Sequence, residues 1–321
     1  MVGKYSEIKK IYDDIKKLNI QGATNVAIAT LEGMKVYEQI SKETDKEVFY
    51  KELIEVGTEL SLARENEPMA RNGVTYVKYS FGQRFSELPT IEVMKQIVPS
   101  LCDEYVDLID DFTEEGSKDD FLKKVSYFFG NYKKIFTHCH SSAAVALIKS
   151  MSKSDPKFEA VCTETRPLYQ GRKTARKLLE AGVKTTLIAD SAGESFIIGR
   201  GSIKTEIVFI GCDKITSGGH AVNKIGSWGF AMAAHYVDKP LYVVTPILKI
   251  DADSYVYDLK IEVRESSELW EDAPKGLSMY NPAFEIVDSK LITGYVTELG
   301  IIKPNDIEKV ALQAYPWLLQ K

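Results

Sequence analysis

The stretch "KIFTHCHSSAAVALIKSMSKSDPKFEAVCT", residues 134–163, contains two short apolar runs with a helical pattern between them. The runs at 134–138 and 158–163 have the length of buried strands, whereas 142–151 has the apolar spacing of a helix. A strand, a helix and a second strand in this order predict a βαβ unit with parallel strands. The same rhythm continues in "YQGRKTARKLLEAG" (169–182), "TTLIAD" (185–190), "EIVFIG" (206–211) and "LYVVTP" (241–246). Because such crossovers are right-handed, we expect one Rossmann-like, doubly wound layer.

The N-terminal part of the chain shows helical spacing of apolar residues and no strand pattern. Ile11 and Ile15, for example, lie four residues apart and so on one face of a helix. Pro99 predicts a kink or a break in a later helix, because proline has no backbone N–H to donate. The sequence therefore predicts an α/β protein with an N-terminal helical domain over residues 1–130. A Rossmann-like α/β domain is expected over residues 131–321.

Composition limits the class of protein. The chain has 321 residues, of which 44% are hydrophobic and 27% are charged, and a net charge of −5. These values fit a globular protein with room for two cores, and the acidic balance argues against nucleic acid as the main partner. No apolar run approaches the roughly 20 residues of a membrane span, and "MVGKYSEIKK" lacks the apolar core of a signal peptide. We therefore expect a cytoplasmic protein without a membrane partner, with its four cysteines as free thiols.

Polar side chains collect where the predicted strands end. In an open parallel sheet, ligands bind outside the carboxyl ends of the strands. The residues at these ends, in chain order, are His138, Cys139, His140, Glu164, Arg166, Gln170, Asp190, Asp213, Asn223 and Lys224. The chain has neither a GxxxxGK[ST] phosphate loop nor a complete dinucleotide fingerprint, which argues against kinase, GTPase and dehydrogenase functions.

Cys139 is the candidate proton carrier. It lies where a strand passes into a helix, and Ser141 or Ser142 is a suitable N-cap. A helix N-terminus favours the thiolate and lowers its pKa. The alternative is a buried cysteine that acts only as a small apolar residue. His138 and His140 are expected to orient or pack, and we predict no metal site because zinc needs a fuller ligand set.

Asp213, Arg166 and Lys224 each have a functional and a structural interpretation. A carboxylate at the end of a buried strand either works chemically or caps the next segment. Arg166 precedes a proline, which favours an extended backbone and a fixed guanidinium that could bind phosphate. Its structural alternative is an ion pair with Glu164. The glycine-rich stretch that carries Lys224 could bind a phosphate, or could be a flexible loop with a solvated lysine.

These residues also carry a family resemblance. "THCHSS", "ETRPLYQGRKTA", "GCDKITSGGHAVNKIG" and "YNPAFE" resemble motifs of one superfamily. It joins ribose-1,5-bisphosphate and methylthioribose-1-phosphate isomerases with the regulatory α, β and δ subunits of eukaryotic initiation factor 2B. "NIQGATNVAIATLEGMKVY" and "ARENEPMARNGVTYV" resemble its helical domain, so the resemblance covers nearly the whole chain. Length and layout look closer to the archaeal-type ribose-1,5-bisphosphate isomerase.

The resemblance implies a set of site residues. Cys139 and Asp213 match the catalytic pair of the isomerases, which the initiation-factor subunits typically lack. The positions that match substrate-binding motifs are Gln21, Gly22, Ala23, Arg64, Arg166, Gln170, Asn223 and Lys224. Two departures stand out: Gln21 replaces an arginine expected to hold a phosphate, and Glu65 and Asn66 replace the Pro-Thr that follows the arginine in the isomerases. The lost charge-assisted contact can be worth about 1.5–3 kcal/mol.

We therefore expect an enzyme, an aldose–ketose isomerase that converts ribose 1,5-bisphosphate to ribulose 1,5-bisphosphate. Cys139 would exchange the carbon-bound proton and Asp213 the hydroxyl protons, without a metal or a redox cofactor. One alternative is a non-catalytic initiation-factor-2B-like subunit that binds a nucleotide or sugar phosphate and meets a translation initiation factor. Another is an isomerase of a different sugar phosphate, such as methylthioribose 1-phosphate.

The resemblance also implies a homo-oligomer, at least a dimer, and allows a nucleotide effector. The C-terminal "YPWLLQK", residues 315–321, supports an oligomer because so apolar an end would be unusual if exposed.

Overall fold

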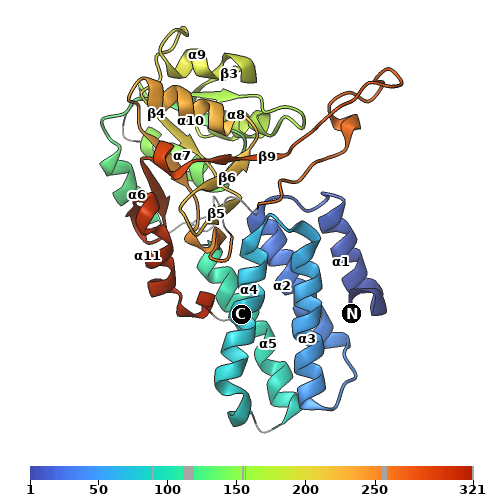
Figure 1. Ribbon diagram of the computed structural model, residues 1–321. Helices are drawn as coiled ribbons and strands as arrows, with labels where there is room; N and C mark the ends of the chain where they lie inside the picture. Colours follow the sequence, from blue (N-terminus) through green and yellow to red (C-terminus); the bar gives the residue numbers. More distant parts are fainter. Residues whose placement is uncertain (89, 111–118, 154, 156, 255–258, 320–321) are drawn as a thin grey trace. The chain divides into compact units, whose positions relative to one another are not determined.

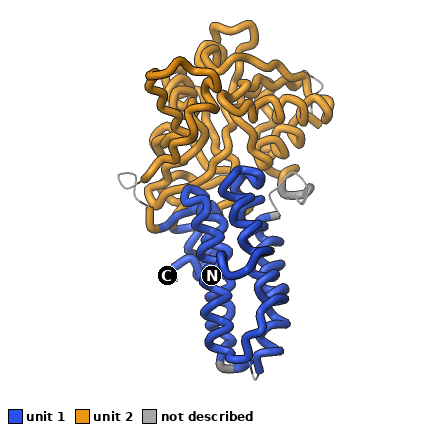
Figure 2. Tube along the Cα trace, turned by 90° about the vertical axis from the view of Figure 1, so that its right-hand side faces the viewer, with its two compact units in different colours: residues 1–110, 248–252, 309–321 blue, residues 111–247, 253–308 orange. Residues whose placement is uncertain are grey.

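The computed structural model describes residues 1–321 except 89, 111–118, 154, 156, 255–258 and 320–321. The chain separates into two compact units, coloured separately in Figure 2. Unit 1 consists of Met1–Asp110, Leu248–Ala252 and Lys309–Lys321. Unit 2 consists of Asp111–Ile247 and Asp253–Glu308.

Unit 1 is helical, as predicted (Figure 1). Its helices are α1 (Ser6–Lys16), α2 (Ala23–Ile40), α3 (Lys46–Ser61), α4 (Pro68–Arg84) and α5 (Ile91–Asp110), and it also holds the short β8 (Ile250–Asp251). Leu31, Phe49 and Val77 are fully buried in its core. The predicted break at Pro99 is wrong, because α5 continues through this residue. Proline removes a single backbone donor, and the packed neighbours of the helix outweigh that loss.

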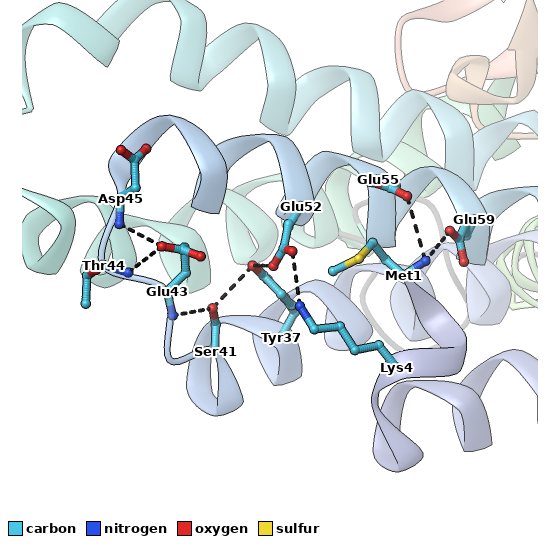
Figure 3. A network of polar contacts seen from close by, with 10 residues as sticks. All are labelled: Met1, Lys4, Tyr37, Ser41, Glu43, Thr44, Asp45, Glu52, Glu55 and Glu59. Atoms are coloured by element: carbon cyan, nitrogen blue, oxygen red, sulfur yellow. Dashed lines mark hydrogen bonds and ion pairs between the residues drawn. The ribbon is translucent and has the colours of Figure 1, made fainter.

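A polar network fastens α2 to α3 and to the segment before α1 (Figure 3). The buried Tyr37 donates its hydroxyl proton to Glu52 at 2.7 Å, and Ser41 donates to the Tyr37 oxygen at 3.2 Å. Lys4 donates to the other oxygen of Glu52 at 3.1 Å. Asp45 caps α3 by accepting hydrogen bonds from two backbone N–H groups of its first turn. The network therefore satisfies the polar groups where these segments meet.

Trp317, near the C-terminal end, is covered by its own chain. The Trp317 side chain is 5% exposed, and its ring lies against the rings of Tyr76 and Tyr105 at centroid distances of 5.4 and 5.9 Å. The apolar end was expected to be covered in an oligomer, whereas Trp317 is covered by residues of its own unit. Packing within unit 1 accounts for this residue, so it gives no argument for an oligomer.

The compact units differ from the predicted domain ranges in three places. One is the short segment Leu248–Ala252, which was expected in the α/β domain and belongs to unit 1. Helix α6 (Asp119–Phe128) was expected in the helical domain, but Leu122 and Val125 share the core of unit 2. Residues 309–321 were expected in the α/β domain and belong to unit 1. Each of these segments belongs to the unit with which its apolar side chains pack, whatever its position in the sequence. The division of the chain into independently folding domains stays a prediction.

Unit 2 contains the predicted parallel sheet (Figure 1). Its strands are β1 (Lys134–His138), β2 (Glu159–Thr163), β3 (Lys184–Ile188), β4 (Ile207–Ile210), β7 (Leu241–Val244), β10 (Gly294–Thr297) and β11 (Gly300–Ile302). The strand order is β11-β10-β7-β4-β1-β2-β3, and all neighbours are parallel except β10 and β11. The Rossmann-like α/β fold is therefore confirmed.

Helices cover both faces of this sheet. They are α6, α7 (Ser142–Ser152), α8 (Gln170–Glu180), α9 (Gly193–Ile197) and α10 (Ser227–Tyr236), and α11 (Ile307–Ala314) follows near the end of the chain. Ile135 of β1 belongs to the core that contains α6 and α7. Its neighbour Phe136 faces the other way and contacts Phe230 of α10, with ring centroids 5.1 Å apart. Successive strand residues point to opposite faces, so β1 is buried on both.

The chain reverses its direction of travel across the sheet between β3 and β4. It proceeds from β1 through β2 to β3, then returns to place β4 on the opposite side of β1. The carboxyl ends of β1 and β4 therefore flank a topological switch point, the usual ligand position in such sheets. A smaller antiparallel sheet follows, containing β5 (Lys214–Thr216), β6 (Ala221–Lys224) and β9 (Phe284–Val287).

Among the helices in the described ranges, none combines the length and the apolarity that a membrane span requires.

Candidate active site

Cys139 and Asp213 follow the two strands at the switch point. Cys139 comes directly after β1 and Asp213 shortly after β4, and His138 lies opposite Ile210 in the paired register. A Cβ atom on Gly211 would lie 2.5 Å from the Cβ of Ser141, so only glycine allows these two loops to approach so closely. The Asp213 charge acts on the Cys139 thiol and raises its pKa. The structure thus brings the predicted pair to one sheet edge.

The backbone of Cys139 is fixed in a left-handed conformation, with φ of 65°. Its N–H donates to the Thr165 hydroxyl oxygen at 3.0 Å, and its carbonyl accepts from the Thr174 hydroxyl at 2.7 Å. The extended geometry of β1 therefore ends at His138. The Ser141 side chain caps α7 by accepting from the Ala144 N–H, as predicted.

The expected lowering of the Cys139 pKa is wrong. Burial raises the pKa of this thiol to about 11, and the negative charges of Asp213 and Asp190 add to the increase. The positive charge of Lys224 and a hydrogen bond from the His140 N–H lower the pKa, but they do not offset the loss of hydration. Removing a thiolate from water outweighs the favourable field of the helix N-terminus here. Cys139 is therefore protonated at neutral pH.

Lys224 is a buried cation beside this pair. It lies on β6, not in a flexible loop, and its side chain is 5% exposed. Its Nζ lies 4.8 Å from the centroid of the Phe284 ring, and within the described residues it has neither an ion-pair nor a hydrogen-bond partner. The ammonium group is therefore available to an anion that binds at this edge. Its neighbour Asn223 is also buried and donates to the Ser227 hydroxyl at 2.8 Å.

Arg166 and Gln170 lie in the connection from β2 to α8. Arg166 donates to the Tyr169 hydroxyl and, at 3.0 Å, to the carbonyl of Leu269. The alternative Arg166–Glu164 pair does not form, because Glu164 pairs with Arg172 at 2.8 Å. The buried Oε1 atom of Gln170 has no hydrogen-bond partner in the described part of the chain. Buried polar atoms usually have a partner, so this atom is suited to accept from a ligand.

The other predicted binding residues belong to unit 1. Gln21 is exposed and donates to the Leu18 carbonyl at 2.7 Å, and Gly22 has φ of 88° where α2 begins at Ala23. The Arg64 side chain is 8% exposed and forms an ion pair with the buried Glu67 at 3.1 Å. A carboxylate thus already balances the guanidinium charge of Arg64.

His138 and His140 are held by hydroxyl groups, in keeping with the orienting role expected of them. The ring nitrogens of His138 lie 2.5 Å from the Thr163 hydroxyl and 2.9 Å from the Ile225 carbonyl. Nδ1 of His140 lies 2.9 Å from the Thr174 hydroxyl. Within the described residues, no three His, Cys, Asp or Glu side chains gather as a metal site would require.

Sequence reasoning placed Asp190 at this edge without a role, and it missed the two threonines at the end of β2. The Asp190 carboxylate accepts from the backbone N–H groups of Thr165 and Arg166, both at 2.7 Å, and so fixes the loop after β2. Thr163 and Thr165 contact His138 and Cys139. The pattern "CTET" at the end of the second strand was the available signal, since hydroxyl side chains often satisfy backbone groups where strands end.

His138 makes unit 2 sensitive to acid. Burial lowers the pKa of His138 to about 4, from 6.5 in an unfolded chain; Asp190 opposes the decrease and Lys224 adds to it. The unfolded chain therefore binds a proton first as pH falls, and stability is lost between about pH 6.5 and 4, by about 3 kcal/mol in total. Urea unfolding at pH 7.0, 5.5 and 4.5 measures this loss. In His138→Gln the dependence should become shallower, and parallel curves for the two proteins would contradict the prediction.

The fold and this edge define a Rossmann-like α/β protein with a cysteine, an aspartate and a buried lysine at the switch point of its sheet. The sequence model of the Initiation factor 2 subunit family matches residues 19–304. The chain belongs to this family.

Individual relatives are similar over nearly the whole chain. The ribose 1,5-bisphosphate isomerase of Methanocaldococcus jannaschii is 32% identical, with 99% of each chain covered. The 5-deoxyribose 1-phosphate isomerase of Petrotoga mobilis is also 32% identical, over 92% of this chain and 86% of its own length. The translation initiation factor eIF-2B from Pyrococcus horikoshii OT3 shares the fold, with a TM-score of 0.76 and 21% identity over 94% of this chain and 98% of its own. The homologues are thus isomerases of sugar phosphates, which supports an aldose–ketose isomerase.

Proposed function

We propose that this protein is an aldose–ketose isomerase of a phosphorylated pentose, with ribose 1,5-bisphosphate as its substrate. The observation that carries the proposal is the buried Lys224, without an anionic partner among the described residues, beside Cys139 and Asp213. An anionic substrate would complete that charge, and two acid–base groups are what an isomerisation requires. The similarity to the M. jannaschii isomerase supports this choice of substrate.

The reaction needs four proton transfers. C2 loses a proton and C1 gains one, while the C2 hydroxyl loses a proton and the ring oxygen gains one as the sugar opens. We assign the carbon-bound protons to Cys139 and the oxygen-bound protons to Asp213. Because the Cys139 thiol is protonated in the free protein, its proton first passes to Asp213. Asp213 delivers that proton to the ring oxygen, and the thiolate removes the proton from C2.

The second half of the reaction restores both groups. Cys139 returns its proton to C1, and Asp213 takes the proton of the C2 hydroxyl and passes it back to the thiolate. Lys224 stabilises the negative charge that develops on the C2 oxygen. Gln170 accepts from a substrate hydroxyl, while Arg166 and Asn223 complete the binding set. This scheme uses no metal and no redox cofactor.

The test is incubation of the purified protein with ribose 1,5-bisphosphate, followed by ³¹P and ¹³C NMR. Formation of ribulose 1,5-bisphosphate supports the proposal. Because Cys139 returns to C1 the proton that it takes from C2, a substrate labelled with deuterium at C2 should keep that deuterium at C1. 5-Deoxyribose 1-phosphate and methylthioribose 1-phosphate serve as competing substrates. Binding without turnover of any of the three would favour the regulatory-subunit alternative, in which the protein meets a translation initiation factor.

A second candidate, an isomerase of a pentose with a single phosphate, is favoured by Gln21. The resemblance expects an arginine at this position to hold a phosphate, and the similar P. mobilis enzyme is named for a monophosphate. A substrate with one phosphate would not need that arginine. The substrate panel separates the two candidates by the ratio of their kcat/KM values.

Gln21→Arg is expected to improve the use of the bisphosphate. A restored charge-assisted contact of about 1.5–3 kcal/mol corresponds to a KM for ribose 1,5-bisphosphate that is about 10-fold lower or more. The KM for 5-deoxyribose 1-phosphate should change less than about twofold. Asn25→Arg, which adds the same charge to an exposed position one turn further along α2, is the matched control. Equal effects of the two variants on both substrates would show that only bulk charge matters.

A homodimer or larger assembly, a nucleotide effector and a cytoplasmic location remain predictions from the family resemblance. Light scattering coupled to gel filtration measures the first of these directly.

A further inference from the structure

We propose that His138, Thr163 and Thr165 form a positioning relay that holds Cys139 in its left-handed conformation. This inference rests on the proposed function in one respect, namely that Cys139 is the proton carrier. Its contacts run from the end of β6 through β1 and β2 to the Cys139 backbone. None of its three side chains need touch the substrate, so they are positioning residues.

The hydrogen bond between the Ile225 carbonyl and His138 determines the direction of every other hydrogen bond in the relay. The Ile225 carbonyl can only accept, so the His138 Nε2, 2.9 Å away, must carry the proton. A neutral ring then has a bare Nδ1, which accepts from the Thr163 hydroxyl at 2.5 Å. The Thr163 oxygen in turn accepts from the Thr165 hydroxyl at 3.3 Å. The Thr165 oxygen is left as the acceptor for the Cys139 N–H at 3.0 Å.

Both ends of the relay are anchored. At one end, the Glu285 carboxylate accepts from the N–H groups of Gly226 and Trp228, at 2.6 and 2.8 Å, and so fixes the chain around Ile225. At the other end, Asp190 accepts from the Thr165 N–H. His138 and Thr165 are both buried, so water does not compete for these hydrogen bonds.

The relay has a consequence for the thiol. A non-glycine residue rarely adopts positive φ unless its surroundings enforce it. The backbone conformation of Cys139 determines how the next N–H, that of His140, meets its sulfur, and this hydrogen bond lowers the pKa of the thiol. Loss of the relay should therefore weaken the stabilisation of the thiolate as well as displace the sulfur.

The tautomer of His138 can be read in the unmodified protein. Long-range ¹H–¹⁵N spectra of the imidazoles should show His138 with Nε2 protonated and Nδ1 bare between about pH 5.5 and 8. The chain has 4 histidines, so spectra of His140→Gln, His220→Gln and His235→Gln identify the His138 signals without changing that ring. A ring protonated on Nδ1, or on both nitrogens, would overturn the relay.

Threonine variants test what the relay does. Thr165→Val keeps the shape and removes the hydroxyl, whereas Thr165→Ser keeps the hydroxyl. We expect Thr165→Val to lower kcat about 10- to 100-fold with KM changed less than about threefold, because a displaced catalytic group slows chemistry more than binding. Thr165→Ser should stay within about threefold of the wild type. The control is Thr185→Val, the same change on β3, where the hydroxyl bonds only the Val183 carbonyl among the described residues.

Alkylation of Cys139 by iodoacetamide, followed by peptide mass spectrometry, gives a readout that needs no substrate. In Thr165→Val the pH midpoint of alkylation should rise by about half a unit or more, and in Thr165→Ser it should not move. Unchanged midpoints and kcat in Thr165→Val, or equal losses in the serine variant, would overturn the relay. If Thr165→Val does not fold, the tautomer and the serine variant decide. If no sugar is turned over, the alkylation and tautomer results still stand apart from the proposed function.

Discussion

Cys139→Ser is expected to lower turnover of ribose 1,5-bisphosphate about 1,000-fold, with the protein still folded. The substitution keeps the size of the side chain and the backbone hydrogen bonds to Thr165 and Thr174. A serine hydroxyl gives up its proton far less readily than a thiol, and proton transfer by a positioned group contributes about 100- to 10,000-fold. The measurement is the initial rate of ribulose 1,5-bisphosphate formation by NMR.

The matched control for this variant is Cys102→Ala, which removes a buried thiol from unit 1. It should keep at least about half of the turnover, because a cysteine with a purely packing role is replaceable by a small apolar residue. Residual activity of Cys139→Ser above about a tenth of the wild type would remove Cys139 from the mechanism. A loss of similar size in Cys102→Ala would point to general instability instead.

Asp213→Asn should lower kcat at least about 100-fold and at the same time make Cys139 more reactive toward a thiol reagent. The amide has the shape of the carboxylate but cannot carry the oxygen-bound protons. The Asp213 charge raises the pKa of the Cys139 thiol, so its removal should lower that pKa and speed alkylation at neutral pH. Opposite changes in turnover and in thiol reactivity would be hard to produce by unfolding.

The control is Asp238→Asn. Asp238 is exposed just after α10 and has φ of 54°, a backbone conformation that asparagine tolerates. The substitution removes the same charge from unit 2 as Asp213→Asn does. Turnover and alkylation should both match the wild type. If Asp213→Asn keeps its turnover, the oxygen-bound protons move by another route. If its alkylation slows, the two side chains do not interact as the structure indicates.

Local sequence was sufficient for the architecture of the α/β part. The spacing of "KIFTHCHSSAAVALIKSM" predicted β1 and α7, and Ser141 caps that helix as expected. The site followed from the same reasoning, since parallel strands place their carboxyl ends at one edge. That rule predicted Cys139, Asp213, Arg166 and Lys224 at one edge of the sheet. Motifs supplied the family, and the match over residues 19–304 confirms it.

Three features depended on contacts between residues far apart in the sequence. The thiol of Cys139 was expected to have a lowered pKa from its position at a helix N-terminus, but burial raises it. The apolar C-terminal end was expected to be covered in an oligomer, but Tyr76 and Tyr105 of the same chain cover Trp317. Helix α6 was expected with the N-terminal helices, but its apolar face packs with unit 2.

The sequence by itself determined five of the parallel strands and the helices between them, and its motifs supplied the family and the candidate catalytic pair. The strands and helices depend on hydrophobic spacing, which is a local property, whereas the family and the pair came from the resemblance of short motifs. Only the tertiary structure decided the protonation of Cys139, the ion pair of Arg64 with Glu67 and the contacts of His138 with Thr163 and Thr165. Desolvation and hydrogen bonding depend on which distant groups are brought close, and no window of sequence contains that information.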